Sequence, residues 1–193
     1  MGATFIHGEL EYDQIVAAIK KVDIVISTLA YPQVLDQLKI IDAINVVANI
    51  KRFLPSEFVS EEDTIKRLPP FQAFLDKKIA IRRATEEAGI PYTYVSANCC
   101  GAYFVNFLLH PNDDVREIVV YGNGKTKVLP SPENIPVSII HSVFIKGDLV
   151  NFELGENHYE VSKLYPDHKY KSIDELLDIF LVDPPPPASA AFG

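Results

Sequence analysis

The sequence predicts an α/β fold with a mostly parallel, doubly wound sheet and a small, mostly helical C-terminal part. Three observations predict it. Short β-branched runs alternate with segments whose apolar residues recur every three or four positions. The run at residues 22–27 is almost entirely apolar, which is typical of a parallel strand buried on both faces. Hydrophobic residues make up 48% of the 193 residues, enough to form a buried core.

The first part of the chain alternates strands and helices. Along the first expected helix and directly after its end, Ile15, Ile19 and Val22 recur at helical spacing. The sequence predicts, in order, a strand at residues 3–6, a helix at 11–21, a strand at 22–27, a helix from about Pro32, and a strand at 51–55 that ends at a proline. This βαβαβ order favours a parallel sheet.

The middle of the chain continues the alternation. A helix expected at residues 70–89 begins at a proline and ends at a glycine, which is the usual asymmetry of helix ends. Beyond it, the sequence predicts a strand at 92–95, a short helix at 99–109, a strand at 116–121 and a hairpin-type turn at 123–124.

Three prolines at residues 130–136 interrupt the alternation of strands and helices, and a new helical stretch is expected to begin near Ile135. We therefore expect two parts, residues 1–128 and residues 129–193. In the second part, Ser172 and Glu175 have the spacing of a capping box. The helix that follows carries one apolar face, formed by Ile173, Leu176, Leu177 and Phe180. Four prolines after Asp183 predict an extended, exposed tail.

The charge and cysteine content exclude several classes of protein. The chain has 18 basic and 26 acidic residues, a net charge of −8, which argues against nucleic-acid binding because that needs a basic face. Neither a run of 18 apolar residues nor a signal-peptide pattern occurs, so we expect no membrane association. Cys99 and Cys100 are adjacent, which favours a reducing compartment, and we expect a cytoplasmic protein. The five histidines lack metal-ligand spacing, so no metal site is expected.

The most informative feature is a lysine within the apolar face of the helix expected at residues 70–89. On a helical projection, one stripe contains Phe71, Phe74, Leu75, Lys78 and Arg82, and Lys77 points elsewhere. Burial among aromatic rings disfavours a charged ammonium, so Lys78 is a candidate acid/base residue. In the structural alternative, the aliphatic stem packs and the amine reaches water or an acid such as Glu57. The sequence leaves both open.

Three loops follow the carboxyl ends of strands that are expected to be parallel, at residues 27–33, 55–58 and 96–100. Open α/β sheets bind their ligands at that edge, so the three loops are expected to converge on one crevice. The same serine, asparagine and proline residues also form caps and turns where no ligand binds. The glycine fingerprint for dinucleotides is absent, because Gly122 and Gly124 are followed by neither a third glycine nor a helix.

Three segments together carry a family resemblance: residues 51–58 (KRFLPSEF), the helix that contains Lys78, and residues 92–99 (YTYVSANC). They resemble the plant isoflavone-reductase-like family, a group of NADPH-dependent, NmrA-like, atypical short-chain reductases that includes benzylic ether reductases and phenylpropene-forming enzymes. The C-terminal part is most similar to the eugenol synthase branch, at residues 164–166, 172–180 and 183–192. The resemblance covers nearly the whole chain.

The resemblance implies a Rossmann-like domain and an NADPH-dependent reduction of a small aromatic phenylpropanoid. In the eugenol-synthase-like reaction, a lysine takes the para-hydroxyl proton of coniferyl acetate, acetate leaves, and NADPH gives a hydride to the quinone methide. Lys78 matches that lysine, and Tyr103 matches a residue that faces the substrate. The resemblance assigns to the cofactor pocket Tyr31, Pro32, Gln33, Glu57, Phe58, Lys78, Asn98 and Cys100.

Compared with the family, the doubly wound sheet is expected to be incomplete. Family members carry a first βαβ segment with a glycine-rich loop ahead of the residue that matches Met1, and a further block between those that match Val128 and Leu129. The glycine-rich loop holds the pyrophosphate of the cofactor, so we expect weakened NADPH binding. Unpaired strands are also expected to favour self-association.

Two alternative functions stay open. One is a non-catalytic NmrA-like binding or interaction module, which would pair with a full-length homologue through its open sheet edge. The other is a benzylic ether reductase. The sequence does not distinguish eugenol from isoeugenol as the product.

Overall fold

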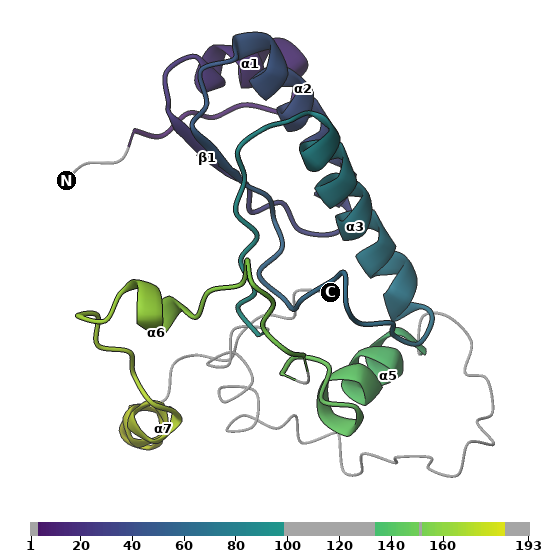
Figure 1. The fold of residues 1–193 in the computed structure, drawn as a ribbon, viewed down its shortest axis with the longest axis vertical. Coiled ribbons are helices and arrows are strands. Elements are labelled where there is room, and N and C mark those ends of the chain that lie inside the picture. Colours follow the sequence, from purple (N-terminus) through teal and green to yellow (C-terminus); the bar gives the residue numbers. More distant parts are fainter. Residues whose placement is uncertain (1–3, 99–133, 151, 184–193) are drawn as a thin grey trace. The chain divides into compact units, whose positions relative to one another are not determined.

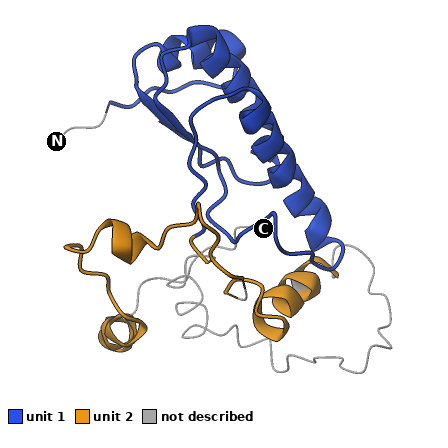
Figure 2. Cartoon of the chain, viewed as in Figure 1, with its two compact units in different colours: residues 1–96 blue, residues 97–193 orange. Residues whose placement is uncertain are grey.

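The computed structural model describes residues 4–98, 134–150 and 152–183. The chain divides into two compact units, residues 1–96 and residues 97–193, which Figure 2 shows in two colours. Several expectations lie outside the described residues: the boundary at residue 128, the helix at 99–109, the strand at 116–121, the turn at 123–124 and the proline-rich tail. The division into residues 1–128 and 129–193 therefore stays a prediction.

The first unit is built on a small parallel sheet, which confirms the predicted α/β class. Its strands are β1 (Ile24–Ile26) and β2 (Arg52–Leu54), which pair in parallel. On its other side, β2 pairs with Tyr92 through a parallel bridge. The Phe53 amide donates to the Pro91 carbonyl at 2.8 Å, and the Phe53 carbonyl accepts from the Thr93 amide at 3.0 Å. Among the described strands, β2 is therefore the central one.

Two segments that the sequence predicts as strands take another form. Residues 92–95 contribute only the bridge to β2, since the Val95 carbonyl accepts a hydrogen bond from the Phe58 amide at 3.0 Å and the segment turns toward the loop after β2. Residues 4–6, the described part of the strand expected at 3–6, are irregular. No described strand lies beside them, and a single extended run without a ladder partner is not held as a strand.

Three helices complete the first unit (Figure 1). Their bounds are α1 (Tyr12–Ile19), α2 (Gln37–Val47) and α3 (Phe71–Glu87), and a 3-10 turn, η1 (Gln33–Asp36), leads into α2. All three helices are predicted by the sequence. The glycine signal at the end of α3 is confirmed, because Gly89 has a φ of 65°, a left-handed conformation that favours glycine.

The core of the first unit lies between the helices and one face of the sheet. It comprises Ile15, Ile19, Ile40, Ile41, Ala43, Ile44, Ile50, Phe53, Ile81 and Ile90. On β1, by contrast, Ile24 and Ile26 are 55% and 60% exposed. Within the described part of the chain, β1 is also paired on one side only. The expectation that the apolar run at residues 22–27 is buried on both faces is therefore wrong for the described residues, in which no element covers the face of β1 that carries Ile24 and Ile26. The exposure agrees instead with the exposed apolar strand edge that the sequence predicts.

The irregular segment between β2 and α3 holds a buried ion pair. The side chains of Glu62 and Arg67 are almost fully buried, and Arg67 Nη1 lies 3.5 Å from Glu62 Oε2. Arg67 also donates to Ser60 Oγ at 2.6 Å and to the Ile65 carbonyl at 3.1 Å. Neither carboxylate oxygen of Glu62 has a hydrogen-bond partner among the described residues. Burial raises the pKa of Glu62 to about 7, and the charge of Arg67 offsets this only in part.

The described part of the second unit is helical. Its helices are α5 (Asn134–Ile140), a π-helical turn η2 (His141–Ile145), α6 (Val161–Leu164) and α7 (Ile173–Val182). The predicted capping box is confirmed at α7: Ser172 Oγ accepts from the Glu175 amide at 3.1 Å, and a Glu175 carboxylate oxygen accepts from the Ser172 amide at 2.6 Å. The sequence does not predict α6, which is too short for a periodic pattern. None of the helices in the described ranges is long and apolar enough to cross a membrane.

We predict that Glu62→Gln reduces the pH dependence of stability. In the folded chain this carboxyl has a pKa of about 7, against 4.5 for the free group, so the folded state binds its proton more readily than the unfolded state does. The free energy of unfolding is therefore expected to fall as the pH rises from about 4.5 to about 7, by up to about 3 kcal/mol from this one group. Urea denaturation at about pH 5 and about pH 7.5 measures that fall in both proteins.

The matched control is Glu87→Gln, which removes one negative charge from an exposed position of α3. This variant should keep the wild-type difference between the two pH values. If Glu62→Gln also kept it, the buried carboxyl would not be the source of the pH dependence.

Candidate functional site

The buried face of α3 carries two charged side chains among apolar ones. The stripe that the sequence predicts is formed: the structure buries Phe71, Leu75, Lys78 and Arg82, and half-buries Phe74. Lys77 is also half-buried, and its ammonium lies 4.8 Å from the centre of the Tyr31 ring. Four positions separate Lys78 from Arg82, so the two cations lie about one helical turn apart on the same face.

Lys78 directs its amine toward the loop that follows β2. The residue is 6% exposed, and its Nζ donates to the Glu57 carbonyl oxygen at 2.6 Å. Nζ also lies 5.5 Å from the centre of the Phe74 ring. Sequence reasoning left open whether the amine reaches water or the acid Glu57. In the structure it reaches Glu57, but at the backbone carbonyl rather than the carboxylate, so a group that does not titrate orients the amine.

The carboxylate of Glu57 is held by Arg82 instead. Arg82 Nε donates to Glu57 Oε1 at 2.7 Å and Nη2 donates to Oε2 at 2.6 Å, and both side chains are 2% exposed. Burial raises the pKa of Glu57, and the hydrogen bonds and positive charge of Arg82 oppose that rise. This two-point pairing matches the planar fork of the guanidinium to the carboxylate.

Arg82 has two further carboxylate partners in the same loop. Its Nη1 donates to Glu61 at 2.5 Å and to Asp63 at 2.9 Å. Burial alone would lower the pKa of the guanidinium, but the hydrogen bonds and negative charges of its carboxylate partners raise it, so Arg82 keeps its charge. The guanidinium carbon lies 4.5 Å from the centre of the Tyr94 ring, and burial and the nearby Glu86 raise the pKa of that tyrosine.

The loops after β1 and β2 contact each other, which agrees with part of the predicted convergence. The third expected loop, residues 96–100, is described only as far as Asn98, so a crevice shared by the three loops stays a prediction. Ser56 Oγ, after β2, donates to the Leu29 carbonyl, after β1, at 2.8 Å. The Ser56 amide donates to Gln37 Oε1 at 2.7 Å, which ties the loop to the start of α2. The Phe58 amide donates to the Val95 carbonyl, which connects the loop after β2 to the segment that follows the Tyr92 bridge. At the end of β1, Ser27 Oγ is buried without a hydrogen-bond partner among the described residues.

The expected cofactor residues after β1 are exposed and lie beside α3. Tyr31 is 50% exposed, and its ring makes an edge contact with Phe74 at a centroid distance of 5.6 Å. Pro32 follows in a cis peptide, and Gln33 begins η1; both are exposed. The structure thus brings this loop to the helix face that carries Lys78.

The other expected site residues are placed less completely. Phe58 is half-buried and has a positive φ of 52°. Asn98 is exposed, also has a positive φ, and belongs to the second unit. Cys100 and Tyr103 lie outside the described residues, so their assignments stay predictions.

Sequence reasoning did not find the role of Arg82. It placed Arg82 on the right stripe, yet gave it no partner. The available signal was the acidic run at residues 61–63, which lies in the loop that faces α3 and contains two carboxylates that bind this arginine. Three acidic residues beside a buried basic position indicate an ion-pair cluster.

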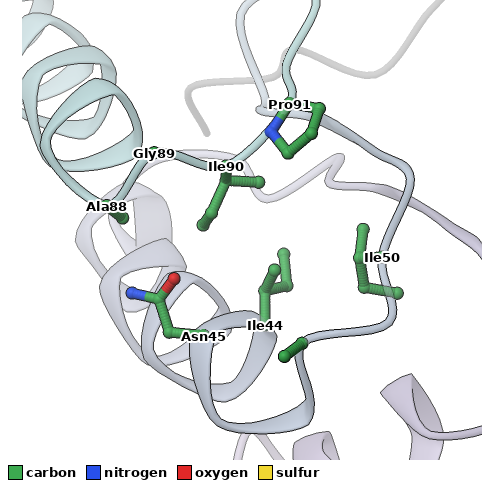
Figure 3. A pocket seen from close by; sticks show the side chains of 8 residues that line it. Ile44, Asn45, Ile50, Ala88, Gly89, Ile90 and Pro91 are labelled. Carbon is green, nitrogen blue, oxygen red and sulfur yellow. The ribbon is translucent and has the colours of Figure 1, made fainter.

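A cavity of about 190 Å³ lies at the other end of the sheet, where β2 and the Tyr92 bridge begin (Figure 3). It is lined by Ile44, Asn45, Ala48, Ile50, Ala88, Gly89, Ile90 and Pro91. Most of its lining residues are apolar, and none of them carries an ionisable side chain. The chemistry-bearing residues instead gather at the carboxyl ends of the strands, the edge at which open α/β sheets bind ligands.

The arrangement around Lys78 suits proton transfer to a ligand lying over that edge. The amine is buried, oriented by one carbonyl and close to aromatic surface. Such an amine can accept or donate a proton at a fixed point. In the described residues, no group of three or more metal-ligating side chains lies nearby to supply a metal alternative.

Comparison with known proteins identifies relatives of this chain. The NmrA-like family model matches residues 1–117. An isoeugenol synthase from Clarkia breweri is 42% identical over 267 aligned positions that cover the whole of this chain and 83% of the relative. A eugenol synthase from Petunia hybrida is 32% identical, covering 93% of this chain and 82% of the relative. The 267 positions exceed the 193 residues here, so a part of the Clarkia breweri protein has no counterpart in this chain.

Solved structures with a similar fold come from related plant reductases. Crystal structures of pinoresinol-lariciresinol and phenylcoumaran benzylic ether reductases include a chain with 26% identity and a TM-score of 0.69, covering 93% of this chain and 81% of the other. A binary complex of leucoanthocyanidin reductase with NADPH from Vitis vinifera has the same fold, with 23% identity and a TM-score of 0.67 over 90% of this chain and 84% of the other. The chain belongs to the NmrA-like family and, within it, to the plant isoflavone-reductase-like group.

Proposed function

We propose that the chain is an NADPH-dependent reductase of phenylpropanoid metabolism, resembling the enzymes that convert coniferyl acetate to eugenol or isoeugenol. The observation that carries the proposal is the buried Lys78 amine, held 2.6 Å from the Glu57 carbonyl at the ligand-binding edge of the sheet. The similarity to isoeugenol and eugenol synthases supports it, since both relatives align along nearly the whole chain.

NADPH fits the residues at this edge. The exposed loop Tyr31, Pro32 and Gln33 and the unpartnered, buried Ser27 Oγ present polar groups and an aromatic ring where the strands end. A buried hydroxyl without a hydrogen-bond partner, located where the parallel strands end, favours a polar ligand at that position. The relative from Vitis vinifera that binds NADPH shares the fold. When bound, the cofactor would supply a hydride.

The chain's own residues would supply the proton chemistry. Lys78 would take the para-hydroxyl proton of the aromatic substrate, which makes the departure of acetate from the side chain easier. The Glu57 carbonyl orients the amine for that step, and Phe74 shields one side of it. Positioned acids and bases of this kind contribute about 10²- to 10⁴-fold to rates.

We predict that Lys78→Met lowers kcat for coniferyl acetate by about a hundredfold or more, because the amine acts on the substrate proton. Lys51→Met, at an exposed position, is the control and should keep wild-type turnover. NADPH consumption measures the rate, and gas chromatography separates eugenol from isoeugenol. Equal turnover by wild type and Lys78→Met would contradict the assignment.

The dissociation constant for NADPH is best measured on two chains side by side, by titration calorimetry. One is the 193-residue chain and the other carries an added glycine-rich β-α-β unit before residue 1. We expect tighter binding by the second, because a glycine-rich loop adds charge-assisted hydrogen bonds to the pyrophosphate. A phenylcoumaran substrate in the same assay tests the benzylic ether reductase alternative.

The exposed strand β1 favours a second candidate, an interaction module. Its exposed Ile24 and Ile26, and its one-sided pairing in the described residues, suit the addition of a strand from a second copy or a longer homologue. In this alternative the chain would bind its partner without turning over a substrate.

We predict that Ile26→Lys lowers the molecular mass seen by light-scattering chromatography, because a lysine on an edge strand opposes strand addition. The matched control is Val46→Lys, which changes an exposed apolar residue of α2 and leaves β1 untouched. If wild type eluted as a monomer, or if both variants behaved alike, pairing through β1 would be excluded.

A further inference from the structure

Arg82 connects the loop after β2 to the helix that carries the Lys78 amine. Both residues are on the buried face of α3, one turn apart. Lys78 binds the main chain of Glu57, and Arg82 binds the side chain of the same residue. Glu57 is therefore held by α3 at two points, its backbone carbonyl and its side-chain carboxylate.

The peptide between Glu57 and Phe58 is held on both of its sides. Its carbonyl accepts from Lys78 at 2.6 Å, and its amide, that of Phe58, donates to the Val95 carbonyl at 3.0 Å. A peptide unit is planar, so these two bonds restrict the rotation of the carbonyl, and a shift of Glu57 would strain both of them. Phe58 has a φ of 52°, which a residue other than glycine adopts only where its surroundings hold it.

The guanidinium makes four hydrogen bonds to three carboxylates in this arrangement. Nε and Nη2 grip Glu57, and Nη1 reaches Glu61 and Asp63. Its planar face lies against the Tyr94 ring at 4.5 Å. A lysine at this position could carry the charge, but it has no planar fork with which to grip a carboxylate at two points.

The neighbouring Arg83 also binds the loop, and it serves as a comparison because it does so without contacting Glu57. Its Nη2 donates to the same Asp63 carboxylate at 2.7 Å, and its side chain is 54% exposed. It has no contact with Glu57 among the described hydrogen bonds and ion pairs. Arg83 thus shares one partner in the loop with Arg82 but not the grip on Glu57.

We propose that Arg82 is a positioning residue for the Lys78 amine: by gripping the Glu57 carboxylate, it fixes the peptide carbonyl that orients the amine. The effect of Arg82 on catalysis rests on the proposed reductase function. In this role Arg82, which is 2% exposed, acts without contacting the substrate or the cofactor. Its contribution passes through the Glu57 backbone.

The test uses the whole chain and the variants Arg82→Lys, Arg82→Gln, Glu57→Gln and Arg83→Lys. Its first readout does not need turnover: the rate at which acetic anhydride acetylates the Lys78 amine, measured by mass spectrometry relative to exposed Lys51. Thermal unfolding monitored by circular dichroism identifies any variant that is not folded. Glu57→Gln keeps Arg82 and the backbone carbonyl and weakens only the charged grip, so it tests the proposal if the arginine variants do not fold.

Both Arg82 variants should raise the relative acetylation rate of Lys78 by about tenfold or more, because loss of the grip opens the loop locally. Glu57→Gln should raise it less, and Arg83→Lys should leave it unchanged. Full protection of Lys78 in Arg82→Lys, or in a folded Glu57→Gln, would overturn the proposal. A rise of the same size in Arg83→Lys would overturn it too, since any loop anchor would then suffice.

The second readout is turnover of coniferyl acetate. Arg82→Lys should lower kcat about tenfold, leave KM for NADPH unchanged and alter the pH profile of kcat, because the amine that moves the proton has lost its orientation. If the role of Arg82 were purely structural, the substitution would lower the fraction of active protein and leave the pH profile of kcat unchanged. An unchanged pH profile would therefore overturn the catalytic part of the proposal. If no form of the chain turned over any phenylpropanoid, the reductase function would fail, while acetylation of Lys78 would still decide whether Arg82 positions it.

Discussion

The pairing of one buried arginine with the carboxylates of an irregular loop determines the form of the site. The segment between β2 and α3 carries several acidic residues, and such a segment favours water over a protein interior. Arg82 brings it onto α3 with hydrogen bonds to Glu57, Glu61 and Asp63. Removing either side of a buried ion pair leaves an uncompensated charge, so helix and loop depend on each other for their folded form.

The location of this ion-pair cluster gives the first unit two chemically different ends. At the amino ends of β2 and the Tyr92 bridge, apolar residues line a small cavity with no ionisable group. At the carboxyl ends, a lysine amine, a buried serine hydroxyl and an exposed aromatic loop gather around the same helix. The proposed removal of a proton from an aromatic hydroxyl requires the second environment, where a positioned amine can accept it.

The sequence predicted the helices better than the strands or the ion-pair cluster. Helical periodicity is local, so α1, α2 and α3 and the stripe around Lys78 could be predicted from spacing alone. The segment at residues 92–95 could not, because its form depends on a hydrogen bond from Phe58, more than thirty residues away. The partners of Arg82 were hidden for the same reason: which carboxylates reach a helix depends on the path of a loop that has no periodicity. The contact to Glu57 was foreseen for Lys78, but the atom was not, since a sequence does not show which way a peptide carbonyl turns.

The central position of β2 ties the site to the register of the sheet. The Phe53 amide and carbonyl both bond to the segment at residues 91–93, while the carbonyl of Leu54 accepts from Ser27 after β1 at 2.9 Å. Glu57 follows only three residues after β2 ends, so the strand fixes its distance along the chain from the core. A slip of β2 by one residue would move Phe53 from the core to the opposite face and carry Glu57 away from α3 at the same time. The contact between Lys78 and Glu57 therefore cannot shift gradually while the fold persists, because the packing of Phe53 in the hydrophobic core fixes the position of both.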